Sequence, residues 1–461
     1  MTTFTKTVLA SLLTFSAAGA SAAAFQLAEG STSGLGMAFS GNAAVADDAT
    51  VVSSNPALMT KFKQVELSAG GILVDSKIDV EGRLLTGQDA SQKSIVPRAV
   101  VPNAYLIAPV NDRFSLGGGV NVNYGLKSEF KPEYSAGFFG GSTSLEAVNV
   151  NLSGAYKLNE YFSFGVGLNA VHAKASLERY LGNAVELAEA KLRRGIAEVT
   201  QKLAFLNQQQ STPENQAAIT ALTAKQVELT RQLTGTQQIN ALTKETDTIH
   251  KLKGDKWGFG WNVGLLYEIN KNHRIGVAYH SAVKLNFKGK YSNNVHMAAE
   301  SLPVVEKATG GAQIGGSLAL TLPAFWEVSG YHKFTDKFAM NYSYKRTDWS
   351  TFKSLDAYTN DGVRLFHKTE NFNDSSRIAV GFSYDVNEKL TLRSGVAFDE
   401  SASVTNPSVS IPDTDRTWYS AGFTYRFTPN LSTDFGYSHI RGSKNQFNEE
   451  GLADFKVKAK A

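Results

Sequence analysis

Residues 151–172, NLSGAYKLNEYFSFGVGLNAVH, carry the pattern that decides the fold. Apolar side chains such as Leu152 and Phe164 alternate with Ser, Gly, Asn and Lys on both sides of a short Asn159-Glu160 turn. A period of two is typical of β-strands, because successive side chains point to opposite faces of a sheet. The stretch therefore predicts an antiparallel pair of strands with one apolar face and one polar face.

The same alternation returns in four later stretches with short polar turns, residues 257–287, 325–345, 377–398 and 418–439. A soluble β-sandwich would also alternate, but its apolar face would favour Val, Ile and Leu throughout. Here Tyr, Trp and Phe gather near the ends of the predicted strands, as they do at the two interfaces of a membrane-spanning barrel. We therefore expect an all-β fold, a transmembrane antiparallel β-barrel with its apolar face turned outward.

The composition is that of a large β-protein without disulfide bonds. The 461 residues include 40 Gly, 11% aromatic side chains and no Cys, which excludes disulfides and thiolate metal sites. The formal net charge is only +4 and is spread along the chain. Because nucleic-acid binding needs clustered Lys and Arg, we expect no nucleic-acid partner.

Residues 1–22 have the features of a signal peptide. Lys6 supplies a positive charge, VLASLLTF (8–15) a short apolar core, and Ala20-Ser21-Ala22 a cleavage site of small residues. The apolar run is shorter than the roughly 20 residues of a membrane-spanning helix, and no later stretch reaches that length either. We expect an exported protein that is either soluble or spans a membrane with strands.

Connections between the predicted strands alternate in length, which is typical of outer-membrane barrels. Short turns are predicted at 109–113, 159–160, 270–273, 335–337, 387–389 and 428–430. Long connections are predicted at 75–94, 126–144, 178–254, 288–324, 346–375, 400–415 and 441–454.

The longest connection contains a helical hairpin, predicted over residues 184–235. Apolar residues follow helical spacing on both sides of Ser211-Thr212-Pro213-Glu214, where hydroxyl groups can cap a helix and Pro suits its first turn. The second helix is predicted to end near Gly235. We favour a hairpin that packs on itself; the alternative is that its apolar stripe forms part of a lipid-capturing groove.

Catalytic and metal-binding motifs are not found. The sequence has no G-x-S-x-G, Walker-type phosphate loop or H-E-x-x-H, and its GLG, GVG and GFG triplets lack the context of a dinucleotide site. His172 and His332 fall on predicted strands, where a neutral polar role is commoner than metal ligation. We therefore expect no enzyme activity, no cofactor and no metal site, and passive passage as the mode of transport.

Several segments together resemble the FadL family of outer-membrane long-chain fatty acid transporters. They are residues 25–59, 122–130, 150–180, 257–268, 325–331, 365–368 and 411–416, in one order along nearly the whole mature chain. The resemblance implies a barrel of about fourteen strands (65–461) in the outer membrane of a Gram-negative bacterium. It also implies an amino-terminal hatch (23–64) inside the barrel, with Asn55, Pro56 and Ala57 at its gate. Pro56 cannot donate a ladder hydrogen bond, so the hatch cannot continue into the sheet.

The resemblance implies a ligand site inside the barrel. Phe25, Leu177 and Leu252 match apolar positions of a slot for the acyl tail, and Arg179 and Lys368 match basic residues near the carboxylate. Arg179 follows Leu177 by two residues, so both side chains point to the same face of an extended segment. An Arg can bind a carboxylate through charge-assisted hydrogen bonds.

A lateral exit is implied as well. Residues 121–130 match a strand that is kinked inward in the family, with Tyr124 and Gly125 at the opening, and Gly125 suits a bulge or sharp kink. The function implied is passive uptake of long-chain fatty acids with lateral release into the membrane. Alternatives are a channel for aromatic hydrocarbons, a general aqueous porin, an outer-membrane lipid hydrolase, or an adhesin role of the surface loops.

The partners expected on this basis are long-chain fatty acids, outer-membrane lipid with lipopolysaccharide, and the barrel assembly machinery, with the protein itself a monomer. Its carboxyl end is unusual for such a barrel. Thirteen full strands can be counted from Val65, and only the stub DFKVKAKA (454–461) follows them. The family's last strand ends in an aromatic residue, whereas Ala461 ends this chain, so we expect a truncated last strand and a gap beside the strand at 65–74.

Overall fold

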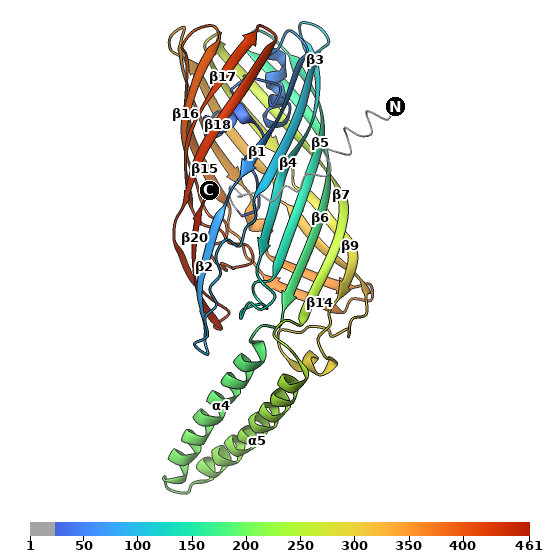
Figure 1. Ribbon diagram of the computed structural model, residues 1–461, viewed down its shortest axis with the longest axis vertical. Helices are drawn as coiled ribbons and strands as arrows, with labels where there is room; N and C mark the ends of the chain where they lie inside the picture. The colour runs from blue at the N-terminus through green and yellow to red at the C-terminus, as the bar shows by residue number, and fades with distance from the viewer. Residues whose placement is uncertain (1–23) are drawn as a thin grey trace.

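The computed structural model describes residues 24–461, so the predicted signal peptide lies outside the described residues. Figure 1 shows a tall barrel of tilted strands with short helices inside its upper part and a long helical hairpin projecting from its lower end. All twenty strands belong to one sheet. No helix in residues 24–461 is long and apolar enough to cross a membrane.

The strands pair antiparallel in every case, and most pair with their neighbours in the chain. Their bounds are β1 (Glu66–Val74), β2 (Lys77–Leu84), β3 (Ala99–Pro109), β4 (Phe114–Glu129), β5 (Ser142–Lys157), β6 (Phe162–Tyr180), β7 (Thr248–Asn270), β8 (His273–His280), β9 (Val283–Ser292), β10 (Ile314–Leu322), β11 (Phe325–Lys333), β12 (Phe338–Thr347), β13 (Ser354–Thr359), β14 (Arg364–Thr369), β15 (Ser375–Asp385), β16 (Leu390–Asp399), β17 (Arg416–Thr428), β18 (Leu431–Gly442), β19 (Asn445–Glu449) and β20 (Ala453–Lys460).

Side chains on the barrel wall are apolar outside and polar inside. On β7 the outward positions carry Trp257, Phe259 and Trp261, and Phe259 is 75% exposed. Inward Asn side chains on β4 to β7 bond to one another; Nδ2 of Asn169, for example, donates to Oδ1 of Asn262 over 2.9 Å. The alternation therefore has the direction that the sequence predicts for a barrel in lipid.

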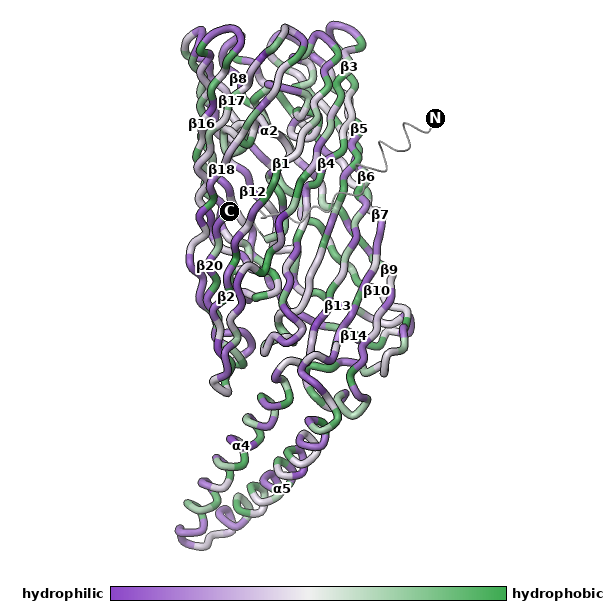
Figure 2. The backbone as a smooth tube through the Cα atoms, in the orientation of Figure 1, coloured by the Kyte–Doolittle hydropathy of each residue, from purple (hydrophilic) through white to green (hydrophobic). Residues whose placement is uncertain are grey.

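The strands run farther than the apolar alternation indicates. β2, β9, β10, β13 and β14 extend into the connections predicted at 75–94, 288–324 and 346–375, so those loops are shorter than expected. The reason is that beyond the apolar band the outer face of the barrel is polar too. Apolar and polar residues then no longer alternate, although the chain is still a strand. Figure 2 shows β2 and β20 as mostly hydrophilic.

The helical hairpin consists of α4 (Ala184–Asn207) and α5 (Pro213–Leu242). Oγ1 of Thr212 accepts a hydrogen bond from the backbone N–H of Asn215 over 3.1 Å, which caps α5 as the sequence indicated. The expected end near Gly235 is wrong, because α5 continues seven residues farther, to Leu242. One Gly inside a helix costs only about 1 kcal/mol, too little to end a helix of this length.

The hatch fills the lumen at the end of the barrel that carries the short turns (Figure 1). It contains α2 (Thr32–Leu35), α3 (Val51–Ser54) and the 3₁₀ helix η1 (Pro56–Lys61). Buried apolar residues of α3 and η1 pack on inward residues of β3 and β5, among them Tyr105, Ile107 and Ala155.

Asn55 joins the hatch to the wall. Its Nδ2 donates to the carbonyl oxygen of Ala43 in the hatch over 2.7 Å and to that of Leu265 in β7 over 3.1 Å. Its Oδ1 accepts from the N–H of Ala57 over 3.0 Å, which begins η1. Pro56, at the first position of η1, needs no N–H donor there.

Three wall glycines receive this corner of the hatch. A Cβ added at Gly264 would overlap Oδ1 of Asn55, one at Gly276 would overlap the carbonyl oxygen of Ala43, and one at Gly165 would lie 2.6 Å from the backbone nitrogen of Ala57. Gly165 and Gly264 are direct cross-strand partners on β6 and β7. The hatch backbone thus lies directly on the wall backbone, as glycine permits.

One seam of the wall has no continuous ladder. β1 pairs with β3, and in the described chain no strand pairs with its other edge. β18 pairs along its length with β17, whereas on its other edge contact is confined to its last residues: Arg441 pairs with Lys460 of β20, and Ile440 exchanges backbone hydrogen bonds with Ala461. β20 instead pairs with β2 and β19. The truncation expected from the sequence stays a prediction.

We predict that Gly264→Ala displaces the hatch without unfolding the barrel. The new methyl group cannot share space with Oδ1 of Asn55, and overpacking of this kind costs about 1–3 kcal/mol. Trypsin should then cut at Lys61 and Lys63 several-fold faster, while heat-modifiable migration on gels stays native. Gly154→Ala is the matched control, because its Cβ would have only ordinary contacts at 3.7–3.8 Å. Unchanged cleavage in the Gly264 variant would contradict the packing described.

Candidate functional site

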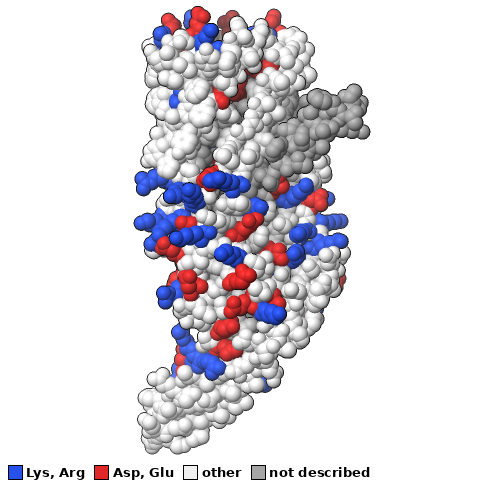
Figure 3. Space-filling model, viewed as in Figure 1, with Lys and Arg blue, Asp and Glu red and all other residues white. Residues whose placement is uncertain are grey.

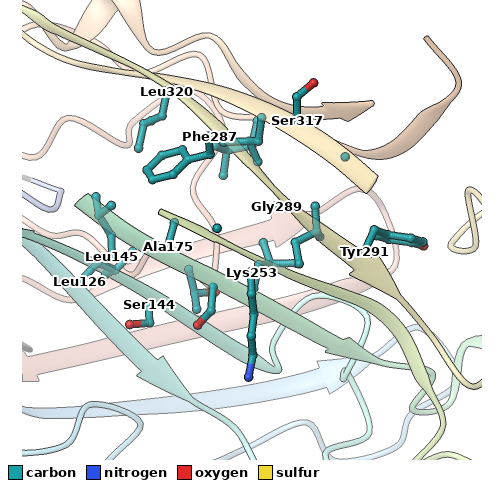
Figure 4. A pocket seen from close by; sticks show the side chains of 18 of the residues that line it. Leu126, Ser144, Leu145, Ala175, Lys253, Phe287, Gly289, Tyr291, Ser317 and Leu320 are labelled. Atoms are coloured by element: carbon teal, nitrogen blue, oxygen red, sulfur yellow. The ribbon is translucent and has the colours of Figure 1, made fainter. Parts of the chain in front are cut away.

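A cavity of about 750 Å³, including the space at its mouth, lies in the half of the barrel farther from the short turns. Strands β4 to β7, β9, β10 and β13 form its wall, and Phe25 of the hatch forms part of its lining. Figure 4 shows Phe287 and Leu320 on one side of it and Leu126, Leu145 and Ala175 on the other. Almost all its lining is apolar, as ligand pockets for apolar molecules usually are.

The cavity exists because the inward positions change character along the strands. Where β5 to β7 carry Asn nearer the hatch, they carry Leu145, Leu177 and Leu252 here. Across β7, β9 and β10, Gly254, Gly289 and Gly316 stand side by side in register. A row without side chains leaves space between the wall and the leucines.

Phe25 closes the cavity on the hatch side. Its ring is 2% exposed and lies 4.6 Å from the ring of Trp349 and 5.6 Å from that of Phe352, both edge-on. The ring of Tyr124 is 6.3 Å away. Such aromatic groups gain about 0.5–1.5 kcal/mol per pair beyond burial, so the first residues of the hatch are held firmly to this site.

A buried charged group lies at one end of the cavity. Arg179 is 1% exposed, and its guanidinium donates to the carbonyl oxygens of Ser142 and Glu178 and, over 3.0 Å, to Oγ1 of Thr143. Nζ of Lys368 lies 2.7 Å from Oε1 of Glu449. Oε2 of Glu449 accepts the N–H of Val409 over 3.2 Å.

Glu370 adds a second acid to this group. It is fully buried, and neither carboxylate oxygen has a hydrogen-bond partner in the described chain. Lys368 interacts electrostatically with Glu370, Glu449 and Arg179. Two bases thus stand against two acids in a region that water does not reach, and an unpaired buried carboxyl group favours its uncharged form.

The structure brings most of the predicted ligand residues together. Phe25, Leu177 and Leu252 line the cavity. Leu177 and Arg179 are both buried on the inner face, as their spacing predicted. Arg179 and Lys368 are not among the lining residues, but Lys368 is the direct cross-strand partner of the lining residue Leu355.

Two further predicted groups lie elsewhere. Asn55, Pro56 and Ala57 contact the wall at the opposite end of the lumen, away from the cavity. Tyr124 and Gly125 are adjacent to Phe25: the N–H of Gly125 donates to the carbonyl oxygen of Phe25 over 3.0 Å, and Tyr124 forms an isolated β-bridge with Gln26.

Glu449 has no signal in the sequence pattern, because the stretch 441–454 is predicted to be a loop. Glu370 could have been found, since it follows Lys368 by two residues, which in extended chain places both on one face. Trp349 and Phe352 lie in a connection without periodicity and had no comparable signal.

The backbone ladder of the wall is interrupted beside this site, between β3 and β4. These strands pair only where Ser115–Val120 faces β3, and farther along, the N–H of Glu129 bonds to the carbonyl oxygen of Ile95. Between these points, no ladder joins residues 121–128 to β3 in the described chain, and the hatch provides the partner instead. The N–H of Leu27 donates to the carbonyl oxygen of Asn123 over 2.8 Å.

The irregularity expected at Gly125 lies two residues earlier. The register of β4 against β5 shifts between Val122 and Tyr124, so Asn123 is the bulged residue. Asn123 tolerates this because its carbonyl oxygen bonds to the hatch and its Oδ1 accepts Nδ2 of Asn121 over 2.6 Å. The hydrogen bonds of Asn123 thus stabilise the bulge, for which a glycine was expected.

No group of three or more His, Asp or Glu in residues 24–461 is arranged to hold a metal ion. The site as a whole offers an apolar cavity, a buried pair of cations with two acids, and a break in the wall closed by three hatch residues. This arrangement suits the binding and passage of an apolar molecule with a charged end.

Comparison with known proteins places the chain among transporters. Residues 13–461 match the family described as outer membrane protein transport protein (OMPP1/FadL/TodX). The chain is 52% identical over 460 residues to the 47 kDa outer membrane protein of Pasteurella multocida, covering 99% of this chain and 96% of that protein. It is 42% identical over 463 residues to the long-chain fatty acid transport protein of Escherichia coli K12, covering 100% and 97%.

Among solved structures, a Pseudomonas aeruginosa FadL homologue has a TM-score of 0.73 at 20% identity, covering 95% of this chain and 97% of that one. The toluene transporter TodX of Pseudomonas putida has a TM-score of 0.57 at 16% identity, covering 89% and 92%. These two establish the fold. The family match and the close relatives show that this chain is a transport protein of the Gram-negative outer membrane rather than an enzyme. It belongs to the OMPP1/FadL/TodX family.

Proposed function

We propose that the protein takes up long-chain fatty acids passively and releases them sideways into the outer membrane. The observation that carries the proposal is the apolar cavity with buried Arg179 and Lys368 beside its lining residues Leu177 and Leu355. A fatty acid needs an apolar enclosure for its tail and a cation for its carboxylate. A neutral aromatic hydrocarbon needs only the enclosure, so the charged group favours the acid.

In this proposal the carboxylate of Glu449 lies where the ligand carboxylate would bind. Its Oε1 is 2.7 Å from Nζ of Lys368, and both side chains have little exposure to solvent. A lone buried cation would be unstable, whereas a paired one is tolerated. An entering fatty acid would exchange its carboxylate for that of Glu449, so that the site stays neutral throughout.

The exit would be the break between β3 and β4. Phe25 links it to the ligand cavity, because its ring lines the cavity and its carbonyl oxygen accepts the N–H of Gly125 at the edge of the break. A tail that displaces the ring would therefore also release the hatch from β4. An apolar solute gains nothing by passing into water, and the break leads to the lipid side of the wall.

The remaining features are assigned by the same proposal. Counting each interrupted strand as one pass, the twenty strands make fourteen passes. The hatch acts as the plug, with Asn55, Pro56 and Ala57 holding it to the wall, and the hairpin of α4 and α5 is an extracellular loop. Folding by the barrel assembly machinery and a monomeric state are part of the proposal.

The first prediction separates the acid from its neutral analogue. Arg179→Ala with Lys368→Ala should weaken oleate binding about 10- to 100-fold, because hydrogen bonds to charged groups contribute about 1.5–3 kcal/mol. Oleyl alcohol should bind the variant within about threefold of the native protein. Calorimetry in detergent measures both ligands, and equal losses for the two would refute a role for the cations.

A second prediction concerns Glu449. Glu449→Gln should strengthen oleate binding several-fold, since the ligand carboxylate no longer competes with an internal one for Lys368. Asp454→Asn, also near the end of the chain but exposed, should leave the affinity unchanged. Weaker binding in the Glu449 variant would show that this side chain supports the site instead of competing for it.

The lateral exit can be tested with an engineered disulfide, because the protein has no Cys. Gln26 and Tyr124 are antiparallel bridge partners, a spacing that a disulfide can span. The Gln26→Cys, Tyr124→Cys variant should lose labelled oleate uptake in cells when oxidised and regain it with reductant. The two single variants and surface expression serve as controls. Uptake that continues with the disulfide formed would exclude release of the hatch from β4.

A further inference from the structure

Four lysines form a cluster on the outer face of the barrel wall. Lys253 lies on β7, and Lys284, Lys288 and Lys290 lie on β9; all four are exposed. Lys253 and Lys290 are direct cross-strand partners. Like charges opposite one another destabilise a sheet, so the arrangement is unfavourable unless anions compensate it.

The protein itself supplies little compensation. None of the four ammonium groups has a carboxylate within 4.0 Å in the described chain. Asp255 is the cross-strand partner of Lys288, but its carboxylate contacts His172 at 3.4 Å. Glu178 pairs with the neighbouring Lys251. On the other side of β9, the outward positions of β10 are Gly315, Ser317, Ala319 and Thr321, which carry no charge.

Some charged side chains at similar positions elsewhere on the wall are paired, and others are not. Glu81 of β2 pairs with Lys456 and Lys458 of β20, and Arg346 pairs with Asp374. Lys77 of β2 and Lys460 of β20 are also like-charged cross-strand partners without an ion pair in the described chain. The cluster of Lys253, Lys284, Lys288 and Lys290 differs in that four lysines gather beside β10, whose outward positions carry no charge.

The cluster borders the apolar band. Figure 3 shows, on the face in view, an upper region that carries few charged side chains below its rim, with a belt of Lys and Arg directly beneath it. On β7 the exposed apolar residues end at Trp257, and Lys253 lies four residues before it in the chain, away from the apolar band. That separation is roughly 13 Å along the strand and roughly 10 Å along the barrel axis. Lys253 thus stands at head-group level on the side of the long connections, and Lys288 and Lys290 lie beside it on β9.

We propose that Lys253, Lys284, Lys288 and Lys290 bind the phosphate groups of lipopolysaccharide in the outer leaflet. Long connections face outward in barrels of this class, so the cluster meets that leaflet and not the inner one. Phosphates provide the closely spaced negative charge that the lysines lack, and basic clusters beside an apolar membrane surface recognise lipid phosphates in this way. Lys253 and Lys290 are also among the residues that line the cavity, so the readout below is lipopolysaccharide binding and not transport.

The test compares two pairs of lysines. Lys288→Ser with Lys290→Ser removes two unpaired outward charges from β9, and Lys456→Ser with Lys458→Ser removes two outward charges from β20 that Glu81 already pairs. Delipidated protein in detergent is titrated with purified bisphosphorylated lipopolysaccharide and followed by native mass spectrometry. We expect about 30-fold weaker binding for the β9 variant, from about 1 kcal/mol per lysine, and a change within twofold for the β20 variant.

Two further arms keep the result interpretable. Lys288→Arg with Lys290→Arg preserves the charge, so this variant should bind lipopolysaccharide as tightly as the native protein does. Dephosphorylated lipopolysaccharide should bind the native protein no more tightly than bisphosphorylated lipopolysaccharide binds the β9 serine variant. Equal binding by the two serine variants would overturn the proposal. So would equally tight binding of phosphatidylglycerol, because it would show attraction to any anionic lipid.

Discussion

The hydrogen bonds of the Asn55 carboxamide are the interaction on which the arrangement inside the barrel depends. They connect a hatch carbonyl to a wall carbonyl, and they can form only because glycines at 165, 264 and 276 let the two backbones meet. A barrel of this width has a polar lumen that must be filled by something other than a strand. The hatch is fixed to the wall at this corner. Its first residues extend into the other half of the lumen, where Phe25 closes the cavity.

The inner wall has two kinds of surface, and each suits what it contacts. Near the hatch, Asn side chains of the wall bond to one another, and Nδ2 of Asn121 donates to Oγ of Ser53 in the hatch. Farther along, leucines and a row of glycines form an apolar cavity, and Arg179 and Lys368 are buried beside it. Burial of charges on this scale is unfavourable unless they are balanced. Glu449 provides part of that balance for Lys368 without a ligand, and in our proposal a ligand carboxylate takes over that part.

Much of this could be read from the sequence, and the failures have physical causes. The alternation of apolar and polar residues, with aromatic residues near the ends of the strands, indicated the barrel. A strand in a barrel wall has one face toward lipid, so its apolar residues recur at every second position. Leu177 and Arg179 could be placed on one face from their spacing alone. Glu449 could not be found, because its pairing with Lys368 joins strands eighty-one residues apart in the chain. The ends of the strands and of α5 were misjudged where polar outer faces weaken the period and where one glycine does not end a helix. The bulge was misplaced because Asn123 is held by hydrogen bonds that a local pattern does not reveal.

The most direct test of this account is a structure with a fatty acid that carries a heavy atom at the end of its tail, such as an ω-bromo long-chain acid. Anomalous scattering locates the bromine without reference to the fitted chain. We predict a bromine peak among the apolar side chains between Phe287 and Leu318, with the carboxylate within hydrogen-bond distance of Nζ of Lys368 and Glu449 turned away from it. A carboxylate bound elsewhere, with the Lys368 and Glu449 pair intact, would contradict the account.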